Sequence, residues 1–379
     1  MSGRARRALF VVLISLALLL LIAPGAGATG FRGPVIWLGQ QLYFDTHLSS
    51  PDGQSCASCH TPSAGYADPD AGLPVSEGVI AGRFGGRNAP SAAYAAFSPP
   101  FGLQSVDGES LYIGGQFWDG RAADLAAQAK GPFLNPVEMN DPDKASVVAE
   151  VRASRYAALF RHVYGRDSLA PHNVDRAYDD IADAIAAFES SRAVNSFSSR
   201  YDAWLAGRAR LTPLEHKGLT LFNGKAMCDR CHPSGTGETA VVGRPLFTDY
   251  SYDNLGIPVN QAYFAPPLDR DSATYQPDLG LGVTTGDPTQ DGMFKVPTLR
   301  NIAKTAPYGH DGYFATLKAI VHFYNTRDVA SAGWPAPEVP ATVNHDELGN
   351  LGLTPQQEDA IVAFLRTLSD RRVLPVPLH

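Results

Sequence analysis

The chain has 379 residues, of which 44% are hydrophobic and 18% are charged, and its formal net charge is −7. This is the composition of a globular protein with enough apolar residues to build two hydrophobic cores. The net negative charge argues against nucleic acid or an anionic membrane surface as a partner.

The N-terminus has the pattern of an export signal. Three arginines within residues 4–7 precede an apolar run over residues 8–23, and small residues follow at positions 26–28. A basic start, an apolar middle and a small-residue exit are typical of a secretory signal peptide. We therefore expect residues 1–28 to be a signal peptide and the protein to reside in the periplasm. The run is shorter than the roughly 20 residues that span a bilayer, and an uncleaved N-terminal anchor is the alternative.

All four cysteines of the chain lie in two Cys-x-x-Cys-His motifs, at residues 56–60 and 228–232. Two thiols one helical turn apart add to the two vinyl groups of haem, and the adjacent histidine then reaches the iron. A redox dithiol does not require two copies, and a four-cysteine zinc site does not require a histidine after each pair. The sequence therefore predicts two covalently bound c-type haems. The residues expected to bind them are Cys56, Cys59, His60, Cys228, Cys231 and His232.

The segments before the two motifs are similar, which suggests an internal duplication. Residues 39–44 precede the first motif and residues 218–222 precede the second, and both resemble the short helix that opens a cytochrome c domain. We expect a mainly α-helical protein with two cytochrome c-like domains, over residues 29–205 and 206–349, each around one covalently bound haem. A C-terminal helix within residues 350–379 is expected to pack back on the first domain.

Local signals mark several helices, and one long stretch lacks them. Residues 212–215 (Thr-Pro-Leu-Glu) and 354–357 (Thr-Pro-Gln-Gln) are capping boxes with proline at the first helical position. Residues 233–292 are rich in Gly, Pro, Asp and Thr without periodicity, so we expect long irregular loops there. One apolar face with helical spacing is formed by Tyr178, Ile181, Ile185 and Phe188.

The residues after the first motif offer its haem no obvious second ligand. The next histidine after His60 is His162, more than a hundred residues further on. An iron that is open on that side can bind peroxide, whose cleavage needs a base to move a proton. Glu138 is a candidate for this base, although an isolated glutamate is more commonly solvated. A tryptophan such as Trp118 is likewise more commonly a core aromatic residue.

Two long blocks carry a family resemblance. Residues 117–140 (FWDGRAADLAAQAKGPFLNPVEMN) and 294–317 (FKVPTLRNIAKTAPYGHDGYFATL), together with the two haem motifs, resemble the bacterial diheme cytochrome c peroxidases. The resemblance implies a peroxidatic haem in the first domain and an electron-transfer haem in the second. It also implies that Glu138 is the acid–base residue, that Gln128 lies beside it, and that Trp118 lies between the haems and helps electrons cross.

The same resemblance implies a calcium ion at the domain interface. Its protein ligands are expected to be the Asn88 side chain and the main-chain carbonyls of Thr305 and Pro307. Oxygen ligands of this kind suit a hard cation.

The chain departs from the family pattern at both haems. Many members hold a distal histidine in the stretch that corresponds to residues 78–87, which here contains none. We therefore expect a first haem that is open without reductive activation, unless a remote side chain closes it. The second haem has a tyrosine, Tyr324, where many members have a methionine fourteen residues after His310. Tyr324 is the expected ligand, and Met227 and Met293 are the rivals.

Three functions follow as alternatives. The first is a peroxidase that reduces hydrogen peroxide to water with electrons from a small cytochrome c or copper protein. The second resembles the methylamine-utilisation (MauG-like) diheme enzyme, which shares the His–Tyr pairing and uses peroxide to oxidise tryptophans of a partner protein. That enzyme has a surface tryptophan two residues before its second motif, where this chain has Ala226, although Trp204 or a tyrosine could serve instead. The third is a diheme electron carrier without catalysis. Relatives often form homodimers, so a homodimer is also possible.

A few residues keep two interpretations. Arg87, Arg121 and Arg300 either pair with haem propionates, since guanidinium–carboxylate contacts suit such sites, or tie loops together. His310 matches a family position near the second haem, and it could equally serve in structural hydrogen bonding.

Overall fold

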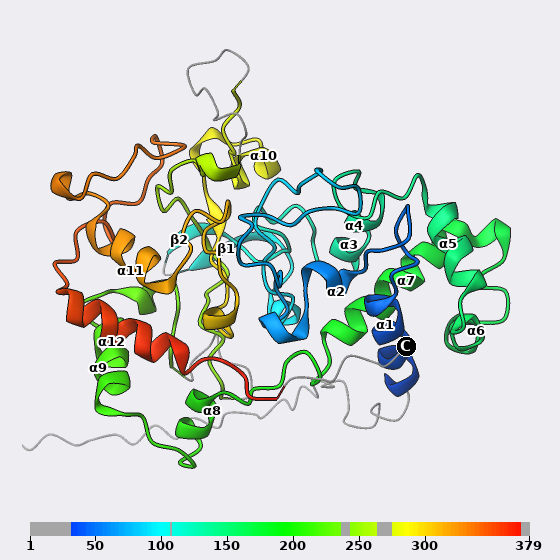
Figure 1. Ribbon diagram of the computed structural model, residues 1–379, viewed down its shortest axis with the longest axis horizontal. Helices are drawn as coiled ribbons and strands as arrows, with labels where there is room; N and C mark the ends of the chain where they lie inside the picture. The colour runs from blue at the N-terminus through cyan, green and yellow to red at the C-terminus, as the bar shows by residue number, and fades with distance from the viewer. Residues whose placement is uncertain (1–31, 107, 236–242, 264–274, 373–379) are drawn as a thin grey trace, which may run out of the picture.

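Two pairs of crossed helices organise the chain, one pair in each half (Figure 1). The computed structural model describes residues 32–106, 108–235, 243–263 and 275–372. In the first half, α1 (Arg32–Phe44) packs on α7 (Val174–Glu189). In the second half, α9 (Pro213–Phe222) packs on α12 (Pro355–Arg366). A Cys-x-x-Cys-His motif follows the first helix of each pair.

A glycine at each crossing lets the two helix backbones touch. A Cβ atom at Gly39 of α1 would lie 1.8 Å from the carbonyl oxygen of Ala184 in α7. A Cβ atom at Gly218 of α9 would lie 1.9 Å from the carbonyl oxygen of Ala360 in α12. The same device at the same place in both halves agrees with the duplication expected from the sequence.

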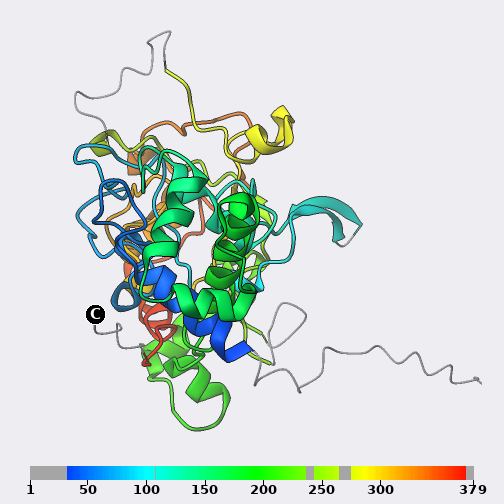
Figure 2. The same cartoon turned by 90° about the vertical axis from the view of Figure 1, so that its right-hand side faces the viewer.

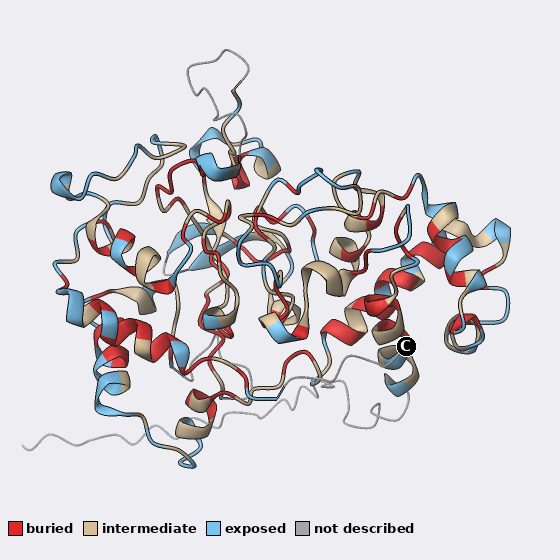
Figure 3. Ribbon diagram, in the orientation of Figure 1, coloured by how far each residue is buried: buried red, intermediate tan, exposed pale blue. Residues whose placement is uncertain are grey.

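The first core lies between the α1–α7 pair and a layer of shorter helices. The four residues of the predicted apolar face of α7 are all buried, so this prediction is confirmed (Figure 3). The apolar side chains of α1 and of the surrounding loops complete this core. The shorter helices are α3 (Leu125–Ala129), α4 (Gly131–Leu134), α5 (Lys144–Ala153) and α6 (Ala157–Tyr164).

The second core lies between α8 (Arg200–Leu205), α9, α11 (Leu317–Thr326) and α12. Both predicted capping boxes are confirmed. The Thr212 main-chain N–H donates to the Glu215 side chain at 2.7 Å, and Glu215 N–H donates back to the Thr212 hydroxyl at 3.3 Å. The same exchange at the start of α12 joins residues 354 and 357.

The expected position of the C-terminal helix was wrong. Ile361, Phe364 and Leu365 of α12 pack in the second core, against α9. The apolar face of α12 predicts that the helix is buried, but it does not show which helix packs against it. That partner depends on the shape of the facing surface, which α9 provides. Only after the helix ends does the chain reach the first half, where the Tyr94 hydroxyl donates to the Asp370 carboxylate at 2.6 Å.

The expected domain boundary after residue 205 was also one helix too late. Tyr201 and Trp204 of α8 pack in the second core rather than in the first. Because α8 is short and half-apolar, its sequence alone does not show which core it joins.

Loops make up most of the remaining chain, as expected for the described part of residues 233–292. Strands β1 (Gly102–Val106) and β2 (Glu109–Ile113) form an antiparallel hairpin that projects from the body (cyan in Figure 2). Strands β3 (Tyr252–Asp253) and β4 (Phe294–Lys295) form a second short pair. The other short helices are α2 (Cys56–Cys59), α10 (Leu281–Thr285) and the 3-10 turns Pro62–Ala64, Ala95–Phe97, Pro171–Asn173, Cys228–Arg230, Gln261–Tyr263, Pro288–Gln290, Ile302–Lys304 and Ala330–Ala332.

The expected signal peptide, residues 1–28, lies outside the described residues. Within the residues that the structure describes, no helix combines the length and the apolar character needed to cross a bilayer.

Candidate functional site

One cavity of about 730 Å³ reaches both Cys-x-x-Cys-His motifs. Its wall is formed by segments of both halves, from α2 and the loops around it to α11. Every residue that the sequence analysis assigned to a haem, to catalysis or to calcium lines this cavity. They are Cys56, Cys59, His60, Asn88, Trp118, Gln128, Glu138, Cys228, Cys231, His232, Thr305, Pro307 and Tyr324.

Each motif forms a single turn that presents its thiols and its histidine together. The His60 main-chain N–H donates to the Cys56 carbonyl at 2.9 Å, and the His232 N–H donates to the Cys228 carbonyl at the same distance. All four thiols are free, so none is used in a disulfide. They are therefore available to attach a group that fills the cavity.

The two histidines are prepared to bind a metal through one ring nitrogen. Nδ1 of His60 lies 3.3 Å from the Tyr66 carbonyl, and Nδ1 of His232 lies 2.8 Å from the Phe247 carbonyl. A proton on Nδ1 leaves Nε2 free as a ligand atom and fixes the ring orientation. Burial lowers the pKa of both imidazoles, that of His232 to about 4, so both are neutral at pH 7. Two thiols and a neutral imidazole at each motif are the donor set of a c-type haem.

A carboxyl group, Glu138, faces the cavity close to the first motif. Burial raises its pKa, while the charge of Arg121 and the Asn135 side chain act in the opposite direction without cancelling the effect. Gln128, at the end of α3, lines the cavity as well. The structure thus brings together the proposed acid–base residue and its glutamine neighbour at the first motif.

The stretch at residues 78–87 runs beside Glu138. The Val79 N–H donates to the Glu138 carbonyl at 2.9 Å, and a Cβ atom at Gly78 would lie 2.3 Å from the Val137 carbonyl oxygen. Within the described part of the chain, the histidines that line the cavity are His60, His232 and His310. That the first haem is open at rest stays a prediction.

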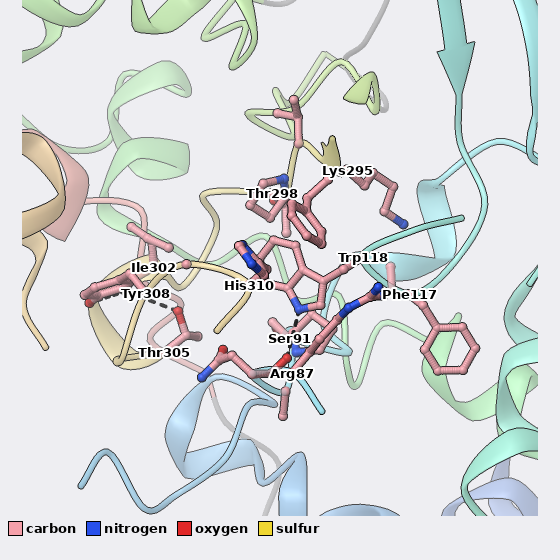
Figure 4. A pocket seen from close by; sticks show the side chains of 18 of the residues that line it. Arg87, Ser91, Phe117, Trp118, Lys295, Thr298, Ile302, Thr305, Tyr308 and His310 are labelled. Carbon is pink, nitrogen blue, oxygen red and sulfur yellow. Dashed lines mark hydrogen bonds between the residues drawn. The ribbon is translucent and has the colours of Figure 1, made fainter. Parts of the chain in front are cut away.

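Trp118 is held between segments of both halves (Figure 4). Its indole N–H donates to the Asn88 carbonyl at 2.8 Å, and its own carbonyl accepts from the Lys295 N–H of β4 at 2.8 Å. The Asn88 N–H in turn donates to the His310 carbonyl at 2.7 Å. His310 is buried, and its ring stacks on Phe294 at 3.7 Å between centroids. The indole is therefore fixed inside the cavity by main-chain hydrogen bonds.

The arginines whose role the sequence left open tie loops together. Arg87 makes two hydrogen bonds of 2.7 Å to Asp278 and one of 2.7 Å to Asp119. Arg121 also donates to Asp119, at 2.8 Å. Arg300 is buried and donates to both carboxylate oxygens of a single aspartate, Asp202, at 3.0 Å each. The carboxylates that these arginines bind belong to the protein, which favours the loop-tying interpretation.

Tyr324 of α11 faces the second motif. Its neighbours include the thiols of Cys228 and Cys231, and burial raises the pKa of its hydroxyl. Of the two rival ligands, Met227 lines the cavity and Met293 is not among its lining residues. Met227 directly precedes the motif, on the segment that also carries His232, whereas Tyr324 comes from a different element.

The sequence analysis missed two ionisable residues in the cavity wall. Lys295 donates to the Gly115 carbonyl at 2.5 Å, and burial lowers its pKa to about 8. Glu189 is the last residue of α7, and burial raises its pKa to about 8. A signal for Glu189 was present, because it lies four residues after Ile185 and therefore continues the apolar face of that helix.

Comparison with known proteins gives consistent matches. A family model described as di-haem cytochrome c peroxidase matches residues 34–210. The methylamine utilization protein MauG of Paracoccus denitrificans is 40% identical, over 96% of this chain and 97% of its own length. Cytochrome c551 peroxidase of Nitrosomonas europaea is 30% identical, over 92% of this chain and 84% of its own.

A solved structure shares the architecture. The diheme peroxidase BthA of Burkholderia thailandensis is 33% identical and superposes with a TM-score of 0.80, covering 89% of this chain and 86% of its own. The sequence identity extends over nearly the whole length of the chain, and the fold is shared with a diheme peroxidase. Both comparisons therefore point to one group of proteins. The chain belongs to the di-haem cytochrome c peroxidase family.

Proposed function

We propose that the chain reduces hydrogen peroxide to water, with electrons that a small cytochrome c or copper protein delivers. The observation that carries this proposal is the single cavity that joins two haem motifs and places Glu138 and Gln128 at the first of them. Its architecture is proposed to be two cytochrome c-like domains, each around one haem that two thioether bonds attach. The glycine-mediated helix crossing repeated in each half supports this duplication.

The haem iron held by His60 supplies the place where peroxide binds and its O–O bond is cleaved. Glu138 accepts the proton of the bound peroxide and returns it to the departing oxygen, which leaves as water. A carboxyl group whose pKa burial has raised is suited to both steps, because it takes up and releases a proton nearer to neutral pH. Gln128 orients the peroxide from the same side of the cavity.

The second half serves electron delivery. His232 and Tyr324 would hold the second haem iron, and Trp118, which lines the cavity and is hydrogen-bonded to both halves, would help electrons cross between the two motifs. We also place a calcium ion at Asn88, Thr305 and Pro307, where the cavity wall is built from both halves. The side-chain N–H of Asn88 donates to the Pro74 carbonyl at 3.0 Å. Oδ1 of Asn88 therefore points away from Pro74 and is left as a ligand for a hard cation.

A second function has its own support. The 40% identity to the methylamine utilization protein MauG and the tyrosine at position 324 favour an enzyme that oxidises residues of a partner protein. Ala226 is 2% exposed, however, and offers no aromatic exit beside the second motif. Peroxidase activity with a small electron donor therefore remains the better account, with the partner-oxidising enzyme as the alternative. We place the reaction in the periplasm, on the basis of the export signal, and a homodimer is compatible with it.

The replacement Glu138→Gln tests the proposed function. Glutamine keeps the size of the side chain but cannot accept the proton, so peroxide turnover is expected to fall about 10²–10⁴-fold while both haems stay bound. Optical stopped-flow spectroscopy with stoichiometric peroxide measures the rate, and intact mass measures haem content. Glu150→Gln, on an exposed position of α5, is the matched control and should react like the wild type. An unchanged rate in Glu138→Gln contradicts the assignment.

A further inference from the structure

Glu189 lies in the wall of the cavity, and within the described residues one of its carboxylate oxygens lacks the hydrogen bond that a buried carboxylate needs. Its side chain is 5% exposed, and the described residues offer its Oε2 atom no hydrogen-bond donor. The side chain lines the cavity together with Ile185, one turn earlier on the same face of α7. An ionised carboxylate in such surroundings costs several kcal/mol, so the group is held neutral by a proton instead.

In the part of the chain that the structure describes, the groups that face Glu189 provide no positive charge. Tyr43 of α1 and Cys56 of α2 are the titratable groups coupled to it, and both are neutral. Asn195, from the loop after α7, donates to the main-chain carbonyls of Glu189, at 2.7 Å, and Ser191, at 3.0 Å. Glu138 faces the same cavity and is also coupled to Cys56. Burial alone raises the pKa of Glu189 to about 8, so a modest change of charge nearby is enough to change its protonation.

Two other carboxylates with little exposure have different surroundings. Asp202 is equally inaccessible, but Arg300 binds both of its oxygens at 3.0 Å. Asp180, on the same helix as Glu189, also has an oxygen without a hydrogen-bond donor among the described residues, but that oxygen pairs with Arg176 at 3.8 Å and Asp180 does not line the cavity. Glu189 alone of these three combines a missing partner with a place at the first motif.

We propose that Glu189 is the proton-exchanging group of the first haem: it takes up one proton when that iron gains one electron, and releases it when the iron is oxidised. The iron passes from ferric to ferrous with an electron from the donor, and the carboxylate becomes a carboxylic acid with a proton from water. This inference rests on the proposed function, because it requires a haem at the first motif.

The physical reason is the loss of one positive charge on reduction. A positive charge close to a carboxyl group in a low-dielectric wall favours the ionised form, so the pKa of Glu189 is lower beside ferric than beside ferrous iron. Between these two pKa values, reduction carries a proton with it. Raising the pH through this window therefore lowers the midpoint potential of the first haem. Since the reduction of peroxide to water consumes one proton per electron, Glu189 would supply the proton that accompanies the electron carried by the first haem.

The test compares Glu189→Gln with the wild type and with Asp180→Asn as the matched control. The midpoint potential of the first haem is measured by spectroelectrochemistry at pH values on both sides of 8. The wild type and Asp180→Asn should show a potential that falls as the pH rises through this range, and Glu189→Gln should lose this dependence. A pH dependence unchanged in Glu189→Gln overturns the proposal.

Infrared spectroscopy gives an independent readout. The reduced-minus-oxidised difference spectrum should contain a carboxylic C=O band that is present in the control and absent from Glu189→Gln. If Glu189→Gln fails to take up haem, Glu189→Asp is used in its place. The shorter acid still exchanges a proton, so the carboxylic C=O band should remain but shift in frequency. An unshifted band would mean that the band does not come from residue 189 and would overturn the proposal. Intact mass is measured first, since a wild-type chain without the first haem contradicts the proposed function rather than the role of Glu189.

Discussion

Two carboxyl groups in one cavity wall differ in what surrounds them. Burial raises the pKa of Glu138, but Arg121 and Asn135 limit the rise. Burial acts without opposition on Glu189. Glu138 is therefore the group that is ionised more readily and can accept a proton during turnover, whereas Glu189 is neutral at pH 7 until the charge beside it changes.

The pH dependence of peroxide cleavage should follow Glu138. The reaction needs its ionised form, so the rate falls as the pH falls through a pKa above the ordinary value of about 4.3. Removing the opposing cation with Arg121→Ala should raise this pKa further and move the acidic limb of the rate profile to higher pH. The measurement is the stopped-flow rate with stoichiometric peroxide at a series of pH values. Arg176→Ala, on the exposed face of α7, is the control, and an acidic limb that Arg121→Ala leaves in place would speak against this role of Glu138.

Tyr324 is expected to set the properties of the second haem. A phenol whose pKa is raised by burial ionises only beside a cation, and a ferric iron at this position provides one. The anionic ligand then stabilises the ferric state. Tyr324→Met should raise the midpoint potential of the second haem and introduce a methionine–iron charge-transfer band. Optical and electron paramagnetic resonance spectra identical to those of the wild type would exclude Tyr324 as the ligand, and Tyr313→Met, outside the cavity lining, is the control.

At the scale of the elements, the two crossed helix pairs carry the fold. In each pair the glycine removes the side chain that would keep the backbones apart, and apolar side chains pack on both sides of the contact. Capping boxes fix where α9 and α12 begin. These signals are local, and the sequence predicted them; the pairing of α12 with α9 depends on a complementary face more than a hundred residues away.

Gly39→Ala should destabilise the protein because the new methyl group meets a backbone oxygen that cannot move aside. Overpacking of this kind costs about 1–3 kcal/mol, and we expect about 3 kcal/mol at a contact of 1.8 Å. Gly218→Ala should behave alike in the second half. Denaturant unfolding measures the loss. Gly33→Ala on the same helix α1 meets nothing within 4 Å and is the control; equal stability of Gly39→Ala and Gly33→Ala would refute the close crossing.

At the scale of the whole molecule, the two halves are joined through the wall of their shared cavity. Arg87 of the first half holds Asp278 of the second through two hydrogen bonds, and it also binds Asp119. Although burial tends to raise the pKa of Asp278, the hydrogen bonds and charge of Arg87 outweigh it and lower that pKa. Trp118 bridges the same two halves, because its carbonyl accepts from the Lys295 N–H of the second half. The geometry between the haem motifs thus depends on this junction.

Arg87→Ala should weaken the junction strongly. It removes the cation that binds the partly buried carboxylate of Asp278 and leaves buried Asp119 with Arg121 alone, and breaking such a pair costs about 3 kcal/mol or more. Thermal unfolding measures the loss. The control is Arg83→Ala. Arg83 is exposed and donates to the Pro136 carbonyl and the Asn140 side chain, and no ion pair joins it to a carboxylate of the described residues, so its loss should change stability by about 0.5 kcal/mol at most. A loss no greater than in that control would mean that Arg87 does not hold the halves together.

The sequence by itself determined the chemistry that neighbouring residues share. Two Cys-x-x-Cys-His motifs predict two haems, threonine–proline boxes predict helix starts, and the spacing of Ile181 and Ile185 predicts a buried face, because each involves residues within one or two turns. The blocks around Trp118 and Glu138 indicated the family. The local sequence patterns did not show which of these residues lie close together in the folded protein.

The tertiary structure decided the partners. Arg87 and Asp278 are 191 residues apart in the chain, and nothing local distinguishes an arginine that binds a protein carboxylate from one that binds a propionate. The same holds for α12, whose apolar face fits α9, and for Glu189, which differs from a solvated glutamate only in what packs around it. Contacts between distant segments depend on the path of the whole chain, and burial, which shifts the pKa of Glu189, exists only once that path is complete.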